Sequence, residues 1–317
     1  MLYIYSMRVF CFICILVFAS SCSKEKRSEK AAEKMVEFVS ELSTYAKNLD
    51  PNFLVIPQNG AELAFNYQDI NDGLNQNYLS YIDGVGIESL FYNGSLNPDE
   101  ERLNMLREVV TSKTILVSDN LSDDSNMDNA VSRNSDEGFL AFPRSNNNYD
   151  YLYIPDTIYY ENADDVLNLL DAENYLYLIS TDAYTDRESF ISAIEATNYD
   201  LVIIDAFFDN VLLSPADVGR MKIKANGGQR LVIAYINVGA AENYRYYWQE
   251  KWKLHKPNWL KKPYDGYEDE IWVQFWKSAW KDIIFRNSDS YIDKILISKF
   301  DGAYLDNVEA YYFLYFD

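Results

Sequence analysis

Short apolar runs recur along the chain, and most of them are separated by segments whose apolar residues repeat at helical spacing. The runs predict eight strands, at 53–57, 82–88, 113–118, 175–179, 200–205, 230–236, 271–276 and 300–306. Most of them are continuously apolar rather than alternating, which is typical of parallel strands covered on both faces. The intervening segments, such as 97–112, have the periodicity of amphipathic helices. The pattern therefore predicts an α/β protein.

The number and spacing of these units favour one architecture. Eight strand–helix units in about 280 residues match a (β/α)8 TIM barrel. A doubly wound open sheet is the alternative, but no Gly-rich phosphate loop follows any of the strands. The order of the elements is unusual, because a helix at 31–49 comes first and the strand at 300–306 comes last. A regular barrel starts with a strand and ends with a helix, so joining the two ends would complete the eighth unit.

The first 22 residues form a pattern of their own. Arg8 precedes an apolar run from Val9 to Ala19, which is typical of a secretory signal and too short to span a membrane. The sequence from Ala19 to Cys22 resembles a bacterial lipobox, which implies cleavage before Cys22 and lipidation of its thiol. A plain signal peptide is the alternative.

These features predict a division of the chain into a lipoprotein signal peptide at 1–22, a polar tether at 23–34 and a single barrel at 35–317. The protein is then expected in the bacterial cell envelope, periplasmic or surface-exposed. Its contact with the membrane would be the lipid anchor at Cys22.

The charge and the cysteine content limit the partners and catalytic groups that we expect for this protein. The chain has 28 Lys and Arg against 49 Asp and Glu, a formal charge of −21, so nucleic acid is not an expected partner. Cys11 and Cys14 fall in the leader and Cys22 would carry lipid, which leaves no disulfide or thiol nucleophile. His255 is the single histidine. We expect no metal or cofactor, and carboxylates must then carry any proton transfer.

Acidic and amide residues follow most of the predicted strands. In barrel enzymes the catalytic groups lie at these carboxyl ends. Capping of the following helices is the alternative explanation for any one of them, but the whole set favours an acidic cleft. The candidates are Asn59, Glu62, Glu88, Asp119, Asp205, Asn237, Glu242, Asp306 and Glu309.

All six tryptophans lie between Trp248 and Trp280, interleaved with tyrosines. They are expected either to pack a long loop against the barrel or to form platforms for sugar rings. The sequence leaves both possibilities open.

Three segments resemble one family. "YDLVIID" (199–205), "LVIAYINVGAAENYRYYW" (231–248) and "FDGAYLDNVEAYYF" (300–313) are similar to consecutive signatures of glycoside hydrolase family 114, the endo-α-1,4-polygalactosaminidase-like barrels. The segments "FLVIPQNGAEL", "IDGVGIESLFY" and "KTILVSD" resemble family strands that normally follow the third signature, yet here they precede it. The resemblance covers roughly residues 35–317 in rotated order.

The resemblance implies a circularly permuted (β/α)8 barrel that starts with a helix and ends with a strand. The rival interpretation is a truncated barrel fused to a separate domain. Under permutation, strands 53–57 and 300–305 should be adjacent and parallel, with the helix 31–49 packed beside them.

The resemblance also implies a pair of catalytic carboxylates, Asp306 in the L-D-x-V motif and Glu62 in the N-G-x-E-like turn, with Glu62 as acid/base. Substrate-binding or tuning roles fall to Asp205, Tyr235, Asn237, Glu242, Asn59, Glu88 and Asp119. Arg245 would hold Glu242 or another acid. Glu309 stands where the family more often has Asp, and its role stays open.

The expected function is hydrolysis of an amino-sugar polysaccharide resembling an α-1,4-galactosaminoglycan. The alternative is a non-catalytic carbohydrate-binding surface lipoprotein on the same barrel, because a fold does not settle an activity. A third interpretation is an envelope protein whose aromatic loop binds a partner.

Overall fold

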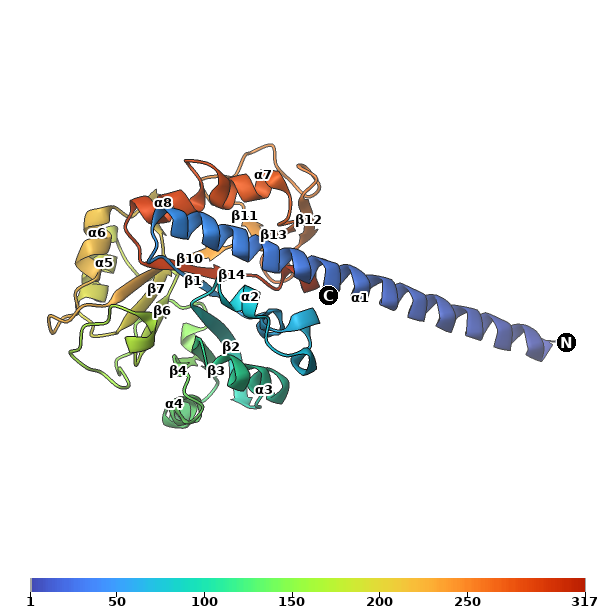
Figure 1. Cartoon of the computed structure of the whole chain (residues 1–317), viewed down its shortest axis with the longest axis horizontal. Helices are drawn as coiled ribbons and strands as arrows, with labels where there is room; N and C mark the ends of the chain where they lie inside the picture. Colours follow the sequence, from blue (N-terminus) through green and yellow to red (C-terminus); the bar gives the residue numbers. More distant parts are fainter. Residues whose placement is uncertain (1, 317) are drawn as a thin grey trace.

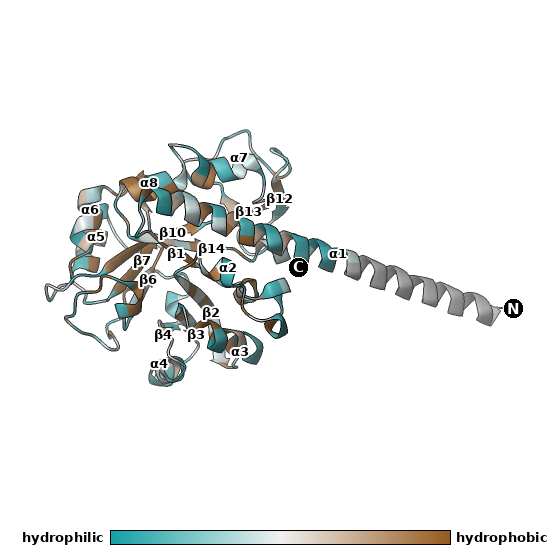
Figure 2. Cartoon of the chain, in the orientation of Figure 1, coloured by the Kyte–Doolittle hydropathy of each residue, from teal (hydrophilic) through white to brown (hydrophobic). Residues whose placement is uncertain are grey.

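The chain folds around a run of parallel strands. The computed structural model describes the backbone of residues 2–316 and the side chains of residues 23–316 (Figure 1). One sheet has five parallel strands, in the spatial order β6 (Tyr175–Leu178), β7 (Leu201–Asp205), β10 (Leu231–Asn237), β14 (Gly302–Asp306) and β1 (Leu54–Pro57). These strands are mostly hydrophobic (Figure 2), and burial of their side chains on both faces stabilises the centre of the fold.

The predicted neighbours 53–57 and 300–305 are adjacent. β1 pairs with β14 in parallel, and Leu54 lies opposite Gly302. A Cβ atom at Gly302 would come within 2.4 Å of the Leu54 carbonyl oxygen, so this close approach requires glycine. The predicted adjacency of these two strands is confirmed.

A second parallel sheet continues the run. β2 (Gly84–Leu96) pairs with β3 (Thr114–Leu121), which pairs with the short strands β4 (Leu140–Ala141) and β5 (Arg144–Ser145). A parallel bridge between Gln58 and Gly86 joins β1 to β2, and the Asn59 N–H donates a hydrogen bond to the Gly86 carbonyl at 2.7 Å. The expected α/β class with parallel strands is therefore confirmed.

One of the predicted strands does not belong to the parallel sheets. The run at 271–276 falls partly in β13 (Glu270–Val273), which pairs antiparallel with β11 (Ala240–Glu242) and β12 (Leu260–Pro263) in a separate small sheet. The additional parallel strand is instead β4, which has only two residues. A strand this short, between Gly138 and Pro143, is too brief to show a periodic apolar pattern.

The first helix covers one side of the parallel run. α1 (Leu2–Leu49) buries a stripe that includes Met35, Phe38 and Leu42. The Phe38 ring meets the Phe285 ring edge-on at 5.2 Å, as expected for a helix packed next to the segment that precedes β14. Among the residues whose side chains are described, no helix is long and apolar enough to cross a membrane.

Helices of uneven length connect the strands. Two of them follow strands β2 and β3, and two more pack side by side next to β6 and β7 (Figure 1). The remaining helices are α2 (Gln76–Leu79), α3 (Glu100–Val109), α4 (Met127–Asp136), α5 (Arg187–Glu195), α6 (Pro215–Met221), α7 (Ser278–Lys281), α8 (Tyr291–Ile297) and α9 (Ala310–Phe313). Between β5 and β6 the chain forms only short 3-10 turns, Asn146–Asn148 and Leu169–Asp171.

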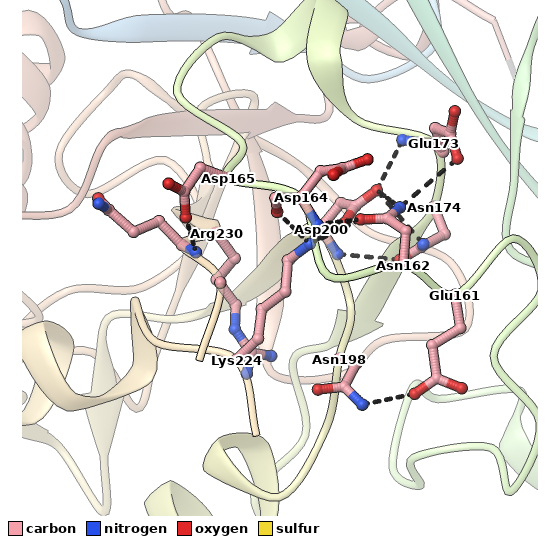
Figure 3. A network of polar contacts seen from close by, with 12 residues as sticks. Glu161, Asn162, Asp164, Asp165, Glu173, Asn174, Asn198, Asp200, Lys224 and Arg230 are labelled. Carbon is pink, nitrogen blue, oxygen red and sulfur yellow. Dashed lines mark hydrogen bonds and ion pairs between the residues drawn. The ribbon is translucent and has the colours of Figure 1, made fainter. Parts of the chain in front are cut away.

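A buried ion pair lies at the amino ends of β6 and β7. Lys224 and Asp200 form this pair with fully buried side chains (Figure 3). Asp200 also accepts hydrogen bonds from the Asn162 side chain at 3.0 Å and the Glu173 N–H at 2.8 Å. Lys224 also donates to the Asp164 carbonyl at 2.7 Å. The network therefore fixes residues 161–174, which contain no α-helix, to the amino ends of the strands.

Candidate active site

A cleft of about 870 Å³ opens at the carboxyl ends of the parallel strands. β7 contributes Asp205, β10 contributes Tyr235, β14 contributes Asp306 and β2 contributes Glu88, while Asn59 follows β1. Parallel strands direct their carboxyl ends to one side of the sheet, which is why residues far apart in the sequence meet there.

Asp306, the last residue of β14, lies half-buried in this cleft. The Tyr235 hydroxyl donates a hydrogen bond to its Oδ2 at 2.6 Å, and the Asn307 N–H donates to its Oδ1 at 2.7 Å. Burial and the negative charge of Glu88 raise the pKa of Asp306 to about 7, against the opposing effect of these hydrogen bonds. Asp306 therefore retains its proton up to near-neutral pH.

The Glu88 carboxylate is held by Arg144 and Tyr151. Arg144 of β5 donates to its Oε1 at 3.2 Å, and the Tyr151 hydroxyl donates to the same oxygen. The Tyr151 hydroxyl also lies 3.0 Å from the Ser118 hydroxyl. The Arg144 guanidinium stacks 4.1 Å from the Tyr151 ring, which in turn lies 3.9 Å from the ring of Tyr177. These contacts fix the Glu88 carboxylate at the wall of the cleft.

A second charged group surrounds Arg245. Its Nε and Nη2 donate to the two oxygens of Glu242 at 2.7 and 3.1 Å, and its Nη1 donates to Asp205 at 2.7 Å. The Tyr244 hydroxyl donates to Glu242 at 2.5 Å. This is the contact between Arg245 and Glu242 that the sequence predicts, with Asp205 added. Because all the polar atoms have partners, the group forms a rigid, polar wall.

Two further acids of the cleft have raised pKa values. Burial and the charges of Glu242 and Asp306 raise the pKa of Glu270, although the Asn237 amide donates to Glu270 at 2.9 Å. Burial and the charge of Glu62 raise the pKa of Glu309 to about 8. Crowded carboxyl groups raise one another's pKa values in this way at many catalytic sites.

Three of the predicted residues do not line the cleft. Glu62 lies in the 3-10 turn Ala61–Ala64, where it accepts a hydrogen bond from the Tyr311 hydroxyl. Asp119 is buried, and it accepts bonds from the N–H groups of Phe91 and Tyr92 at 2.9 and 3.1 Å. Asn237 is also buried and reaches the cleft only through Glu270.

The other eight candidate residues all line the cleft: Asn59, Glu88, Asp205, Tyr235, Glu242, Arg245, Asp306 and Glu309. Cys22 lies outside the described side chains. Within residues 23–316 no group of His, Cys, Asp and Glu side chains is arranged to hold a metal ion.

Several residues of the site carry no signal that sequence reasoning detects. Arg144 and Tyr151 lie in a polar segment without periodicity, and Glu270 belongs to the antiparallel β13. The pairing of β5 with β3 brings Arg144 to the cleft, and the pairing of β13 with β11 brings Glu270 there. Tyr151 is held by its contact with the Ser118 hydroxyl on β3.

The tryptophans pack rather than line the cleft. The rings of Trp252, Trp259 and Trp280 form a chain with centroids 5.1 and 5.3 Å apart, and the Trp280 indole N–H donates to the Val238 carbonyl at 2.9 Å. None of the six tryptophans is among the described residues that line the cleft. The aromatic residues there are mainly tyrosines, of which Tyr244 and Tyr267 are about half exposed.

Asp306, Glu270 and Glu309 have raised pKa values and lie with exposed tyrosine rings in one cleft at the carboxyl ends of the parallel strands. Sites that hydrolyse glycosidic bonds are among those with these features. The comparison with family models agrees. The model of the glycoside-hydrolase family GH114 matches residues 191–314, and this match supports the assignment of the chain to that family.

The relatives are similar to this protein over only part of its sequence. An uncharacterized protein of Thermotoga maritima is 33% identical over 117 residues, which are 35% of this chain and 33% of the relative. An uncharacterized protein of Deinococcus radiodurans is 35% identical over 112 residues, 35% of this chain and 34% of the relative. One of Methanocaldococcus jannaschii is 41% identical over 90 residues, 28% of this chain and 24% of the relative. The chain therefore spans about a third or less of these relatives in the matched region.

Proposed function

We propose that the protein hydrolyses glycosidic bonds through Asp306 and Glu88. Asp306, protonated up to a pH of about 7, donates its proton to the glycosidic oxygen as the bond to the anomeric carbon breaks. Glu88 either attacks the anomeric carbon or removes a proton from the water that attacks it. The observation that carries this proposal is that both groups line one cleft and that the charge of Glu88 acts on Asp306. Of the neighbouring charges, Glu88 has the largest effect on the pKa of Asp306.

The choice of Glu88 over Glu62 follows from position. Glu88 lines the cleft, whereas Glu62 does not. A group that reacts with substrate must reach the reacting atoms within hydrogen-bond distance or through one water. Glu62 is therefore better suited to tune Glu309, whose pKa it raises.

The cleft favours a cationic glycan. Among the described residues that line it, eleven are Asp or Glu and two are arginines, both paired with carboxylates. Even with Asp306, Glu270 and Glu309 protonated, the remaining eight acids outnumber the two arginines, and this negative charge attracts positively charged groups and repels anions. This charge supports a partly deacetylated amino-sugar polymer, resembling an α-1,4-galactosaminoglycan, as the substrate.

Reducing-sugar release from such a polymer tests the proposal. The Asp306→Asn and Glu88→Gln variants should each lose about 10²–10⁴-fold in kcat, the usual contribution of acid–base and nucleophilic groups. Glu62→Gln should retain activity within about tenfold, since it does not reach the substrate. Full activity in either of the first two variants, or a complete loss in Glu62→Gln, would overturn the assignment.

We further propose that the protein is anchored to the cell envelope through a lipid on Cys22. The lipobox-like sequence from Ala19 to Cys22 supports this proposal. Metabolic labelling with a fatty acid should label the wild type and leave a Cys22→Ser variant unlabelled, with the variant released from the membrane fraction.

We also propose that the parallel strands close into a (β/α)8 barrel with a rotated strand order. Closure is supported by the continuous series β6-β7-β10-β14-β1, the bridge from β1 to β2, and the Phe142 ring beside β4, which lies 5.6 Å from the Tyr175 ring on β6. The rotation rests on the order of the segments that resemble the family. A barrel of this kind leaves the most N-terminal and most C-terminal strands as neighbours.

A further inference from the structure

A second cavity lies behind one wall of the active-site cleft. It has a volume of about 350 Å³, which is within the range of sites for small ligands. The segment 144–160, here called the partition, separates the two spaces. Its residues 149–151 line the cleft, its residues 153–157 line the second cavity, and Arg144 contributes to both.

Tyrosine rings dominate the second cavity. They are supplied by the partition and by the residues at the amino ends of β6 and β7, and they are Tyr153, Tyr159, Tyr160, Tyr175 and Tyr199. Tyr153 is 48% exposed and Tyr160 is 52% exposed, so these two rings are accessible to a ligand. Aromatic rings with a polar end suit ligands that present both an apolar face and hydroxyl groups.

The partition is held firmly in place. The Asn148 side-chain oxygen accepts hydrogen bonds from the N–H groups of Leu152 and Tyr153, both at 2.7 Å. The Asn174 amide donates to the Tyr160 carbonyl at 3.0 Å, which joins the end of the partition to the Asp200 network. Tyr151 and Tyr160 both have φ of +55°. Left-handed backbone is strained at non-glycine residues, and such strain clusters at functional sites.

The charge around the cavity is negative. Asp124, Asp156 and Glu173 are exposed residues of its lining, and Arg144 is the single basic residue among the described residues there. Arg144 is itself paired with Glu88. A ligand with a sugar ring and an ammonium group matches both the rings and the charge.

We propose that this cavity is a second, non-catalytic binding site for an amino-sugar chain, which holds a stretch of the polymer outside the cleft. The inference rests on the proposed function for the identity of the sugar. The partition places the two cavities next to each other, so one polymer chain can bind at both. A chain bound at both cavities stays attached to the protein after each cleavage.

Titration calorimetry with an α-1,4-linked galactosamine tetrasaccharide tests the inference. The Asp306→Asn variant serves as the host, since it does not consume the ligand, and it should show two binding events. Adding Tyr153→Ala and Tyr160→Ala should weaken one event by at least ~10-fold, equivalent to about 1.4 kcal/mol. Tyr67→Ala is the matched control, because Tyr67 is 82% exposed and lines neither cavity; it should leave both events unchanged.

A charge reversal provides a second test that leaves the tyrosines in place. Asp156→Lys in the same host should weaken the same event, and a fully N-acetylated tetrasaccharide should bind this site more weakly than the amine. A single event that is insensitive to both sets of changes would overturn the inference and leave the catalytic proposal standing. Two events with no hydrolysis by the wild type would overturn the catalytic proposal alone.

Discussion

At the scale of single residues, the site depends on where charges are placed rather than on which residues are present. Asp306 and Glu309 lie three positions apart, yet different neighbours raise their pKa values, Glu88 for the first and Glu62 for the second. Each of these neighbours comes from the N-terminal third of the chain. The protonation states of the carboxyl groups in the cleft are therefore set by the folded structure.

The raised pKa of Asp306 has a consequence for stability. Burial and Glu88 raise this pKa from its ordinary value of 3.8 to about 7, so between these values the folded state holds a proton that the unfolded chain releases. Stability therefore falls as the pH rises through this window. Asp306→Asn removes the effect and should stabilise the protein by about 2 kcal/mol more at about pH 8 than at about pH 5.5.

Urea unfolding of the wild type and the variant at both pH values measures this difference. A stabilisation that does not change with pH would show that Asp306 is ionised in the folded protein across the whole range.

The Tyr151 hydroxyl donates a hydrogen bond to Glu88, and we expect it to position this carboxylate for the reaction. Tyr151→Phe removes the bonds to Glu88 and Ser118 but keeps the ring stacked on Tyr177. We expect kcat to fall by about 10–100-fold with little change in KM, because a small displacement of a reacting group is costly.

Steady-state kinetics and the pH dependence of kcat measure the effect. Tyr67→Phe removes a hydroxyl from an exposed tyrosine outside the cleft and should change neither. An unchanged pH profile together with a raised KM in Tyr151→Phe would assign Tyr151 to substrate binding instead.

At the scale of elements, short strands and segments without helices require other anchors. β4 has two residues, and the chain from β5 to β6 contains no α-helix among the described residues. The buried network of Asp200 and Lys224 anchors this segment to the sheet, as packed helices anchor the other connections of the fold. It holds the far end of the partition that carries Tyr151.

Lys224→Met should leave the Asp200 charge buried without its cation. We expect a loss of about 3–5 kcal/mol in the free energy of unfolding. Lys222→Met is a matched control two positions away, because Lys222 pairs with Asp301 at a partly exposed site and should cost no more than about 1 kcal/mol. Denaturant unfolding measures both, and equal losses would show that the buried pair has no special weight.

At the scale of the whole molecule, segments from the two ends of the sequence lie together. β14 lies between β10 and β1, and the Ser28 hydroxyl donates to the Tyr311 carbonyl at 3.2 Å. Residues 28 and 311 are therefore close enough for a short linker to connect the regions around them.

A re-ordered chain should fold if the proposed rotation is correct. The variant would begin at Asn168, join Phe316 to Ser28 through a short Gly-rich linker, and end at Leu167, which is 64% exposed. We expect a cooperative unfolding transition and retained hydrolysis, because loop openings at exposed positions are tolerated. Circular dichroism and the activity assay measure the outcome, and a molten or insoluble product would contradict the proposal.

Much of this organisation is predictable from local patterns. The continuous apolar runs predict seven of the parallel strands, and the polar residues at or just after the strand ends include eight residues of the cleft, five of them acids. These predictions succeed because burial on both faces and the position of a strand end are local properties of the sequence. The short β4, the antiparallel β13 and the packing of the tryptophans have no such local signature.

The sequence by itself determined the composition of this protein's core and the supply of carboxylates at the strand ends. Only the tertiary structure decided which carboxylates share the cleft. It buries Asp119, places Glu62 outside the cleft lining but near enough to raise the pKa of Glu309, and brings Arg144 and Tyr151 into contact with Glu88. The physical reason is that a pKa and a catalytic pairing depend on distances between side chains, and these distances are set by strand pairing rather than by separation along the chain.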